Sequence, residues 1–220
     1  MASVESVNVG RARDIGAKSG LTGIDKLPVD GPVSVAAPGP GGQGKSGLDG
    51  DTICDTENHG GDVQAVYAYA REDLDWWEGE LGRELRSGTF GENLTTSGLD
   101  VTGARLGETW RIGDTLLLQV TVPRIPCSVF HAWMRQQGWL KTFTRRAIPG
   151  AYLRVLKPGS IKIGDPIVVE TRPDHDVTIG LTFRAVTLER ELLPRLRDAR
   201  AYLIPDLAQR VETGEVFEID

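Results

Sequence analysis

The hydrophobic and polar positions of the chain change period between residues 64 and 85. The run QAVYAY at residues 64–69 is almost wholly apolar, which is typical of a buried strand. In residues 71–85, Leu74, Trp77 and Leu81 recur at three- and four-residue spacing. This spacing places them on one face of a helix, so the pattern predicts a strand followed directly by a helix.

Short apolar runs separated by turn residues predict most of the remaining body. Residues 106–114 and 161–165 each contain a short strand pattern that ends in Gly-Asp, and each precedes an apolar strand. Residues 31–35 predict another short strand, and residues 36–50 form a loop rich in Gly and Pro. Many short strands separated by turns are typical of a β-barrel.

A second helix is expected in the middle of the chain. Within residues 129–146, the apolar side chains of Phe130, Trp133, Met134 and Trp139 fall on or near one helical face. We therefore expect one continuous helix over this range, inserted between two strands of the barrel.

The character of the sequence changes beyond about Arg172. Residues 188–200 and 204–211 carry charged, Leu-containing helical patterns. The sequence therefore predicts a barrel domain over residues 1–171, followed by a small helical appendage over residues 172–220. The fold class that results is mainly β with helices (α+β).

Composition limits the classes of function. The 220 residues include 40% hydrophobic and 25% charged positions, which is ordinary for a globular protein. The 27 glycines agree with many turns. A net charge of −6 and an isoelectric point near 5.2 argue against a nucleic-acid or membrane-surface protein.

The chain has only two cysteines, Cys54 and Cys127, so it carries no disulfide framework. The N-terminal residues lack the apolar run of a signal peptide, and no apolar stretch could span a bilayer. We expect a cytoplasmic protein with reduced thiols.

Charge is distributed unevenly around Cys127. Residues 115–164 contain no Asp or Glu but hold eight basic residues: Arg124, Arg135, Lys141, Arg145, Arg146, Arg154, Lys157 and Lys162. Cys127 lies here in the run PRIPCS, where two prolines stiffen the chain and cations favour the thiolate. A lone cysteine is most often a small buried hydrophobe. The cationic surroundings point instead to an anionic cofactor bound through a thiolate, a ligand that soft metals select.

Two further segments could contact a ligand. In NHGG at residues 58–61, the glycines would allow close approach, and His59 could move a proton. In GTFGENLTT at residues 88–96, backbone N–H groups could face an anion, as could Asn93 and Thr95. Each segment could equally be an ordinary turn with satisfied polar groups.

Several common enzyme classes have no signature here. The sequence contains no P-loop, no HExxH, no paired CxxC and no Gly-x-Ser-x-Gly. The three histidines, His59, His131 and His175, show no zinc spacing.

The order of these motifs resembles that of MOSC domain proteins (molybdenum cofactor sulfurase C-terminal domain), in the YiiM-like group. The matching elements are NHGG with the strand after it, GTFGENL, the Gly-Asp piece at 106–114, PRIPC, and GAYLRV at 150–155. They cover roughly residues 30–170. The helices after residue 172 resemble the triple-helical segment that often follows in this group.

The resemblance implies a β-barrel that binds a molybdenum cofactor (a Mo-pyranopterin) and reduces N-hydroxylated compounds to amines. It implies that Cys127 is the metal ligand and that His59 is a catalytic proton donor. It also carries a generic association with pyridoxal phosphate. The cofactor-binding residues that it implies are Gly60, Gly91, Glu92, Asn93, Thr95, Arg124, Cys127 and Arg154.

Two features depart from the family pattern or lie outside it. The group often has two histidines before Gly-Gly, and Asn58 replaces the first of them here. Cys54 belongs to no family motif, and we regard it as a bystander.

The predicted reaction requires partners. Because the chain has no flavin or iron–sulfur signature, the electrons for a small N-hydroxylated substrate would come from an external electron-transfer protein. We expect no nucleic-acid or membrane partner, and either a monomer or a homodimer. Two other functions stay open: a sulfur carrier or transferase with a persulfide on Cys127, and a non-catalytic barrel that binds an anionic ligand.

Overall fold

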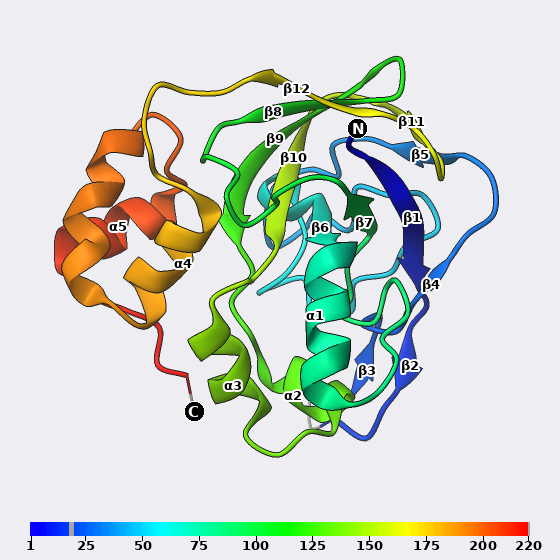
Figure 1. The fold of residues 1–220 in the computed structure, drawn as a ribbon, viewed down its shortest axis with the longest axis horizontal. Helices are drawn as coiled ribbons and strands as arrows, with labels where there is room; N and C mark the ends of the chain where they lie inside the picture. The colour runs from blue at the N-terminus through cyan, green and yellow to red at the C-terminus, as the bar shows by residue number, and fades with distance from the viewer. Residues whose placement is uncertain (18–19, 220) are drawn as a thin grey trace.

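The computed structural model describes residues 1–17 and 20–219 of the chain. Its centre is an eight-stranded sheet in the order β12-β8-β9-β10-β6-β7-β1-β4, which is antiparallel except where β6 pairs with β7 (Figure 1). The strands of this sheet are β1 (Ser3–Gly10), β4 (Lys26–Pro28), β6 (Val66–Ala70), β7 (Leu94–Ser97), β8 (Thr109–Ile112), β9 (Leu116–Pro123), β10 (Ala151–Lys157) and β12 (Ile167–Thr171). Two small ladders join β2 (Arg13–Asp14) to β3 (Leu21–Thr22) and β5 (Val33–Val35) to β11 (Gly159–Ile161).

The strands form where the side chains alternate between the core and the outer face. In β9, Leu116, Leu118 and Val120 are buried, whereas Leu117 and Gln119 between them are half-exposed. Successive side chains of a strand point to opposite faces, so this two-residue period buries one face only.

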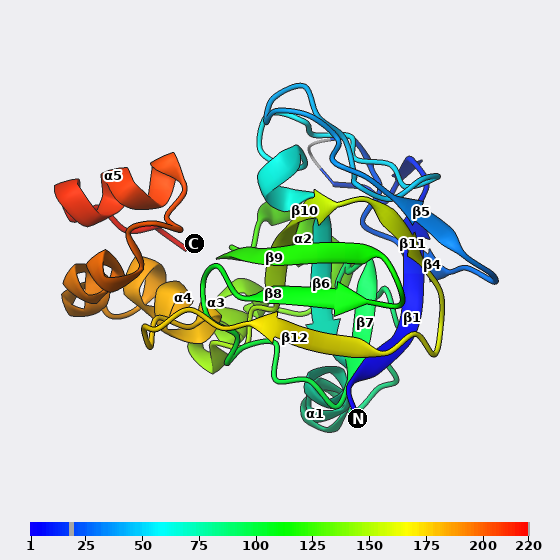
Figure 2. The same ribbon diagram turned by 90° about the horizontal axis from the view of Figure 1, so that it is seen from above.

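The sheet is curved but open, so the prediction of a closed barrel is wrong (Figure 2). Its edges are β12 and β4, which do not pair with each other. Residues 2–4 do hydrogen-bond to residues 164–167, but this contact contains only the isolated bridge between Ser3 and Pro166. Because Pro166 has no backbone N–H, it cannot donate to a ladder there.

Helix α1 (Arg71–Leu81) follows β6 directly, as predicted, and buries Leu74 and Trp77. It ends four residues earlier than the predicted end at residue 85. The cause is Gly82, which takes the left-handed conformation (φ 62°) and donates its N–H to the carbonyl of Glu78. Glycine adopts this conformation without a steric penalty and therefore ends helices.

The single helix predicted over residues 129–146 is two helices, α2 (Ser128–Met134) and α3 (Trp139–Arg146). Left-handed backbone at Arg135 (φ 51°) and Gly138 (φ 68°) separates them. Of the four predicted apolar positions, Phe130, Met134 and Trp139 are buried and Trp133 is half-buried, so periodicity predicted most of the buried face but not the break.

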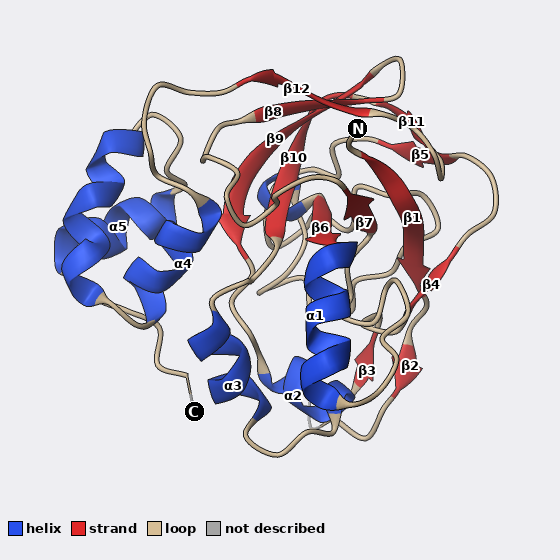
Figure 3. Ribbon diagram, viewed as in Figure 1, coloured by secondary structure: helices blue, strands red, loops and turns tan. Residues whose placement is uncertain are grey.

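After β12 the described chain forms helices only, and these lie to one side of the sheet (Figure 3). They are α4 (Ile179–Thr187), the 3₁₀ helix η2 (Arg190–Ala199) and α5 (Pro205–Thr213). The sequence did not predict α4. These helices and the sheet share one hydrophobic cluster, so the division at residue 171 stays a prediction. No helix in the described ranges is long and apolar enough to cross a membrane.

A second core is aromatic and lies among α1, α2, α3 and β6. Trp77, Phe90, Phe130, Trp139 and Phe143 pack there in mostly edge-to-face pairs. This cluster fixes the start of α2 against the loop that contains Phe90, and both segments form walls of the cavity described next.

Candidate functional site

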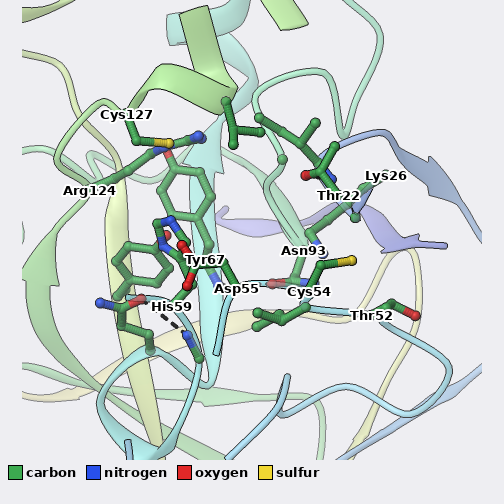
Figure 4. Close-up of a pocket in the computed structure, with 18 of the residues that line it drawn as sticks. Thr22, Lys26, Thr52, Cys54, Asp55, His59, Tyr67, Asn93, Arg124 and Cys127 are labelled. Atoms are coloured by element: carbon green, nitrogen blue, oxygen red, sulfur yellow. Dashed lines mark hydrogen bonds between the residues drawn. The ribbon is translucent and has the colours of Figure 1, made fainter. Parts of the chain in front are cut away.

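A cavity of about 350 Å³ lies at the end of β9, between β6, β10 and the loops that precede β4, β6 and β7. It brings together segments from five parts of the chain. Of the predicted site residues, His59, Gly60, Gly91, Asn93, Arg124 and Cys127 line it. Figure 4 shows Cys127 and Arg124 on one side of this cavity, with Lys26 and Thr22 on the opposite side.

Cys127 lies between β9 and α2, where it occupies the N-cap position of α2. Burial alone would raise the pKa of its thiol. A hydrogen bond with His59, the charge of Arg124 and the backbone N–H of Phe130 together outweigh burial and lower the pKa to about 6. Cys127 is therefore mainly a thiolate at neutral pH.

Arg124 is a buried cation with its guanidinium against two rings. Only 6% of the residue is exposed, and its guanidinium carbon lies 4.0 Å from the ring centroid of Phe130 and 5.2 Å from that of Tyr67. One Nη donates to the carbonyl of Phe90, whereas the buried Nε has no hydrogen-bond partner. Among the described residues Arg124 forms no ion pair with a carboxylate. A buried charge is normally paired, so this guanidinium suits an anionic ligand.

The NHGG loop contributes His59 and Gly60 to the wall. The His59 side chain lowers the pKa of the Cys127 thiol, and the His59 backbone N–H donates to the carbonyl of Asp55. Gly60 has φ 82°, and a Cβ there would lie 2.9 Å from the carbonyl oxygen of Lys45. Glycine is thus required to fold this loop tightly and to turn His59 toward the thiolate.

Gly91 and Asn93 form part of the cavity wall. A Cβ at Gly91 (φ 76°) would meet the Ile24 side chain at 3.1 Å and Arg124 Nη1 at 3.7 Å. The Asn93 amide is fully used: its Oδ1 accepts from the N–H of Tyr67, and its Nδ2 donates to Asp51 Oδ2 at 2.8 Å. Asn93 therefore holds β6 and Asp51 in place while one surface of its side chain faces the cavity.

Two predicted ligand contacts, Glu92 and Thr95, do not line the cavity. The Glu92 carboxylate is fully buried and accepts hydrogen bonds from the N–H groups of Gly88 and Phe90 and from the Thr95 hydroxyl. Burial raises the pKa of Glu92, and these three donors oppose that shift. Glu92 thus holds the turn whose carbonyl at Phe90 accepts from Arg124.

Arg154 also lies apart from the cavity lining. It is half-buried on β10, two residues after Tyr152, and its Nε is buried without a hydrogen-bond partner. Of the eight basic residues around Cys127, only Arg124 lines the cavity. The charge window in the sequence therefore indicated the site but did not identify which cation faces it.

Sequence reasoning missed the cation on the opposite side, Lys26. It is 6% exposed, lines the cavity and forms an ion pair with the buried Asp51. Burial lowers the pKa of Lys26, and Asp51 opposes that shift. Nothing local in the sequence marks Lys26, because its position depends on the pairing of β4 with β1.

Two tyrosines and the second cysteine were also missed. Tyr67 and Tyr152 face each other across β6 and β10, and both line the cavity. Tyr152 belongs to the GAYLRV motif, so its place in a family motif could have identified it as a candidate site residue. Cys54 lines the same cavity, so it is part of the wall rather than a bystander.

The set of donors suits an anionic group that carries a soft metal. Cys127 supplies a thiolate, and the Arg124 cation lacks a carboxylate partner among the described residues. Over residues 1–17 and 20–219, no group of three or more His, Cys, Asp or Glu side chains could hold a metal ion by itself. A metal bound to Cys127 would take its other ligands from a cofactor.

Comparison with known proteins gives the family. The sequence pattern of the MOSC domain matches residues 55–168, which contain His59, Arg124, Cys127 and Tyr152. The chain belongs to the MOSC domain family. Within this family it is similar to the Geobacillus stearothermophilus protein YiiM, whose crystal structure superposes with a TM-score of 0.77. That match is 27% identical and covers 97% of this chain and 99% of the other.

Two relatives extend the comparison. The Bacillus subtilis protein YflK, which is uncharacterized, is 30% identical over 184 residues, covering 83% of this MOSC protein and 79% of YflK. A Gibberella moniliformis protein named "Reductase" is 33% identical over 153 residues, covering 68% of this chain. The match spans only 26% of that reductase, so most of the fungal protein has no counterpart here.

Proposed function

We propose that this MOSC protein binds a molybdenum cofactor through Cys127 and reduces N-hydroxylated compounds to amines. The observation that carries the proposal is the juxtaposition of the Cys127 thiolate with the buried Arg124 in one cavity. A thiolate is a ligand for a soft metal, and a buried guanidinium suits the anionic part of the cofactor. The family membership and the relative named "Reductase" support the same reading.

Different cavity residues would bind different parts of the cofactor. Cys127 would ligate the metal, Arg124 would contact an anionic oxygen, and Lys26 on the opposite side offers a second cation. Gly91 and Asn93 would lie along the polar edge of the pterin. When bound, the cofactor would supply the redox centre that the protein side chains lack.

Reduction of R–NHOH to R–NH₂ and water consumes two electrons and two protons. His59 is our candidate for one proton donor, because it lies in the cavity beside Cys127. The open cavity would admit a small substrate next to these groups. The electrons would come from an external donor protein.

The test uses the full chain purified from a host that makes the cofactor. Reduced methyl viologen serves as the electron source, and an aryl amidoxime serves as the substrate. We expect formation of the amidine with a rate proportional to the bound molybdenum. Protein that retains molybdenum but reduces no amidoxime, hydroxylamine or N-hydroxylated base would refute the reductase function.

One observation favours a second candidate, a sulfur carrier with a persulfide on Cys127. A thiol whose pKa is lowered to about 6 is largely a thiolate at neutral pH and can accept sulfane sulfur. This candidate predicts a labile sulfur on Cys127, released by cyanolysis, in protein that contains no molybdenum. The reductase proposal predicts metal without that sulfur.

A further inference from the structure

Three tyrosines lie on the adjacent strands β6 and β10: Tyr67 and Tyr69 are buried, and Tyr152 is half-buried. Their hydroxyls have different hydrogen-bond partners. The Tyr67 hydroxyl donates to the carbonyl of Pro149, and the Tyr69 hydroxyl donates to that of Ile148, each at 2.7 Å. Among the described residues the Tyr152 hydroxyl takes part in no hydrogen bond, and the residue lines the cavity. Because this hydroxyl has no partner in the part of the protein that the structure describes and its residue lines the cavity, it is free to bond to a ligand there.

The backbone and the neighbouring ring hold Tyr152 firmly. It is paired with Tyr67 across β10 and β6, and the two ring centroids lie 5.0 Å apart at an angle of 36°. The Tyr152 carbonyl accepts from the Thr121 hydroxyl at 2.9 Å. A side chain on a central strand, packed against another ring, keeps its hydroxyl in a fixed position relative to a bound molecule.

A tyrosine phenol is protonated at neutral pH, so the Tyr152 hydroxyl is a hydrogen-bond donor in the cavity. Burial raises the pKa of Tyr152; Arg124 opposes that shift, and Cys127 adds to it. Cys127 and Arg124 line the same cavity as Tyr152. Tyr152 therefore presents an O–H donor in the cavity that contains the expected metal ligand, Cys127.

We propose that Tyr152 is a catalytic residue whose hydroxyl donates a hydrogen bond, and then a proton, to the N-hydroxyl oxygen of the substrate. The inference rests on the proposed reductase function. The N–O bond breaks as two electrons arrive from the external donor. Tyr152 protonates the departing oxygen, which leaves as water, and His59 protonates the nitrogen. Solvent then returns one proton to each residue, so R–NHOH, two electrons and two protons give R–NH₂ and H₂O.

The test variant is Tyr152→Phe, which removes only the hydroxyl and keeps the ring against Tyr67. We expect unchanged molybdenum content and a kcat per bound molybdenum that falls about 10²-fold or more, because a general acid is lost. In the absence of an electron donor, we expect the affinity for an aryl amidoxime to fall about 3- to 10-fold. The affinity for the corresponding amidine should not change, because it lacks the N-hydroxyl oxygen.

Tyr69→Phe is the matched control. It removes a hydroxyl from the neighbouring strand, but Tyr69 is buried in the aromatic core and does not line the cavity. We expect a lower Tm, because the bond to the Ile148 carbonyl is lost, with a kcat per molybdenum within twofold of wild type.

The outcomes separate the inference from the proposed function. Equal kcat per molybdenum and equal amidoxime affinity in Tyr152→Phe and wild type would overturn the role of Tyr152 alone. Loss of molybdenum from Tyr152→Phe would also overturn it, in favour of a role in holding the cofactor. Wild-type protein that retains molybdenum but reduces none of the N-hydroxylated substrates would reject the proposed function and this inference with it.

Discussion

At the scale of single residues, the ionisation of Cys127 is the feature most directly open to measurement. Because its pKa is lowered to about 6, alkylation by iodoacetamide should reach half its maximal rate near pH 6, well below the ordinary range of cysteine. The rate should rise as the pH increases through this value, since the thiolate is the nucleophile. Peptide mass spectrometry separates Cys127 from Cys54. His59→Ala should move the midpoint to higher pH, because one hydrogen bond that favours the thiolate is lost.

Glu92 provides the second prediction at this scale. Glu92→Ala would leave the N–H groups of Gly88 and Phe90 and the Thr95 hydroxyl buried without their acceptor. Each unsatisfied buried group costs on the order of 1–3 kcal/mol, so we expect a loss of about 3 kcal/mol or more in the free energy of unfolding. Urea denaturation measures it. Glu92→Gln keeps the shape and one acceptor oxygen and should lose less; equal losses would show that the hydrogen bonds are not the cause.

At the scale of secondary-structure elements, the break between α2 and α3 depends on backbone conformation. Arg135 is an exposed residue in the left-handed region, which disfavours side chains by roughly 1–2 kcal/mol. Arg135→Gly should relieve this strain and raise the free energy of unfolding by up to about 1 kcal/mol. Thermal unfolding tests the prediction. Arg145→Gly, in the right-handed last turn of α3, should instead lower stability, by up to about 1 kcal/mol, and a fall for both variants would contradict the explanation.

Helices α2 and α3 show what the sequence pattern could and could not predict. Periodicity predicted the burial of Phe130, Met134 and Trp139, because burial follows the spacing of apolar side chains, whereas Trp133 is only half-buried. It did not predict the break, because Arg135 is left-handed without being glycine. The 3₁₀ geometry of η2, which contains Pro194, was likewise not visible in the apolar pattern.

At the scale of the whole molecule, the helices after β12 are tied to the sheet at Gly107. A Cβ on Gly107 (φ 82°) would lie 2.2 Å from a ring carbon of Tyr202, which follows η2. Gly107→Ala should therefore lower the free energy of unfolding by about 2–4 kcal/mol, from backbone strain and overpacking together.

Gly164→Ala supplies the control for that prediction. Gly164 has a similar φ of 84°, but a Cβ there would meet no atom within 4 Å. Gly164→Ala should lower the free energy of unfolding only through backbone strain, by about 1–2 kcal/mol as measured by urea denaturation. Equal losses at the two positions would mean that the contact with Tyr202 does not stabilise the packing of the helices on the sheet.

The sequence predicted only part of the site, because local motifs can be recognised in a sequence and the pairing of distant strands cannot. Motifs that are local in sequence, NHGG and PRIPC, contain residues that do line one cavity. Lys26 comes to it through the pairing of β4 with β1, and Tyr152 through its register with Tyr67. The sequence did not predict that the sheet is open. Closure into a barrel would require a ladder between the start of the chain and the residues around Pro166, and no local sequence pattern indicates whether that ladder forms.

The most direct test of the account is the molybdenum content of the full chain purified from a cofactor-making host. We predict close to one molybdenum per wild-type chain and almost none in Cys127→Ala, with an unchanged circular dichroism spectrum. Cys54→Ala removes the other thiol of the same cavity and should keep its molybdenum. Cys127→Ala that retains molybdenum at the wild-type level, or wild-type protein that never acquires it, would contradict the account.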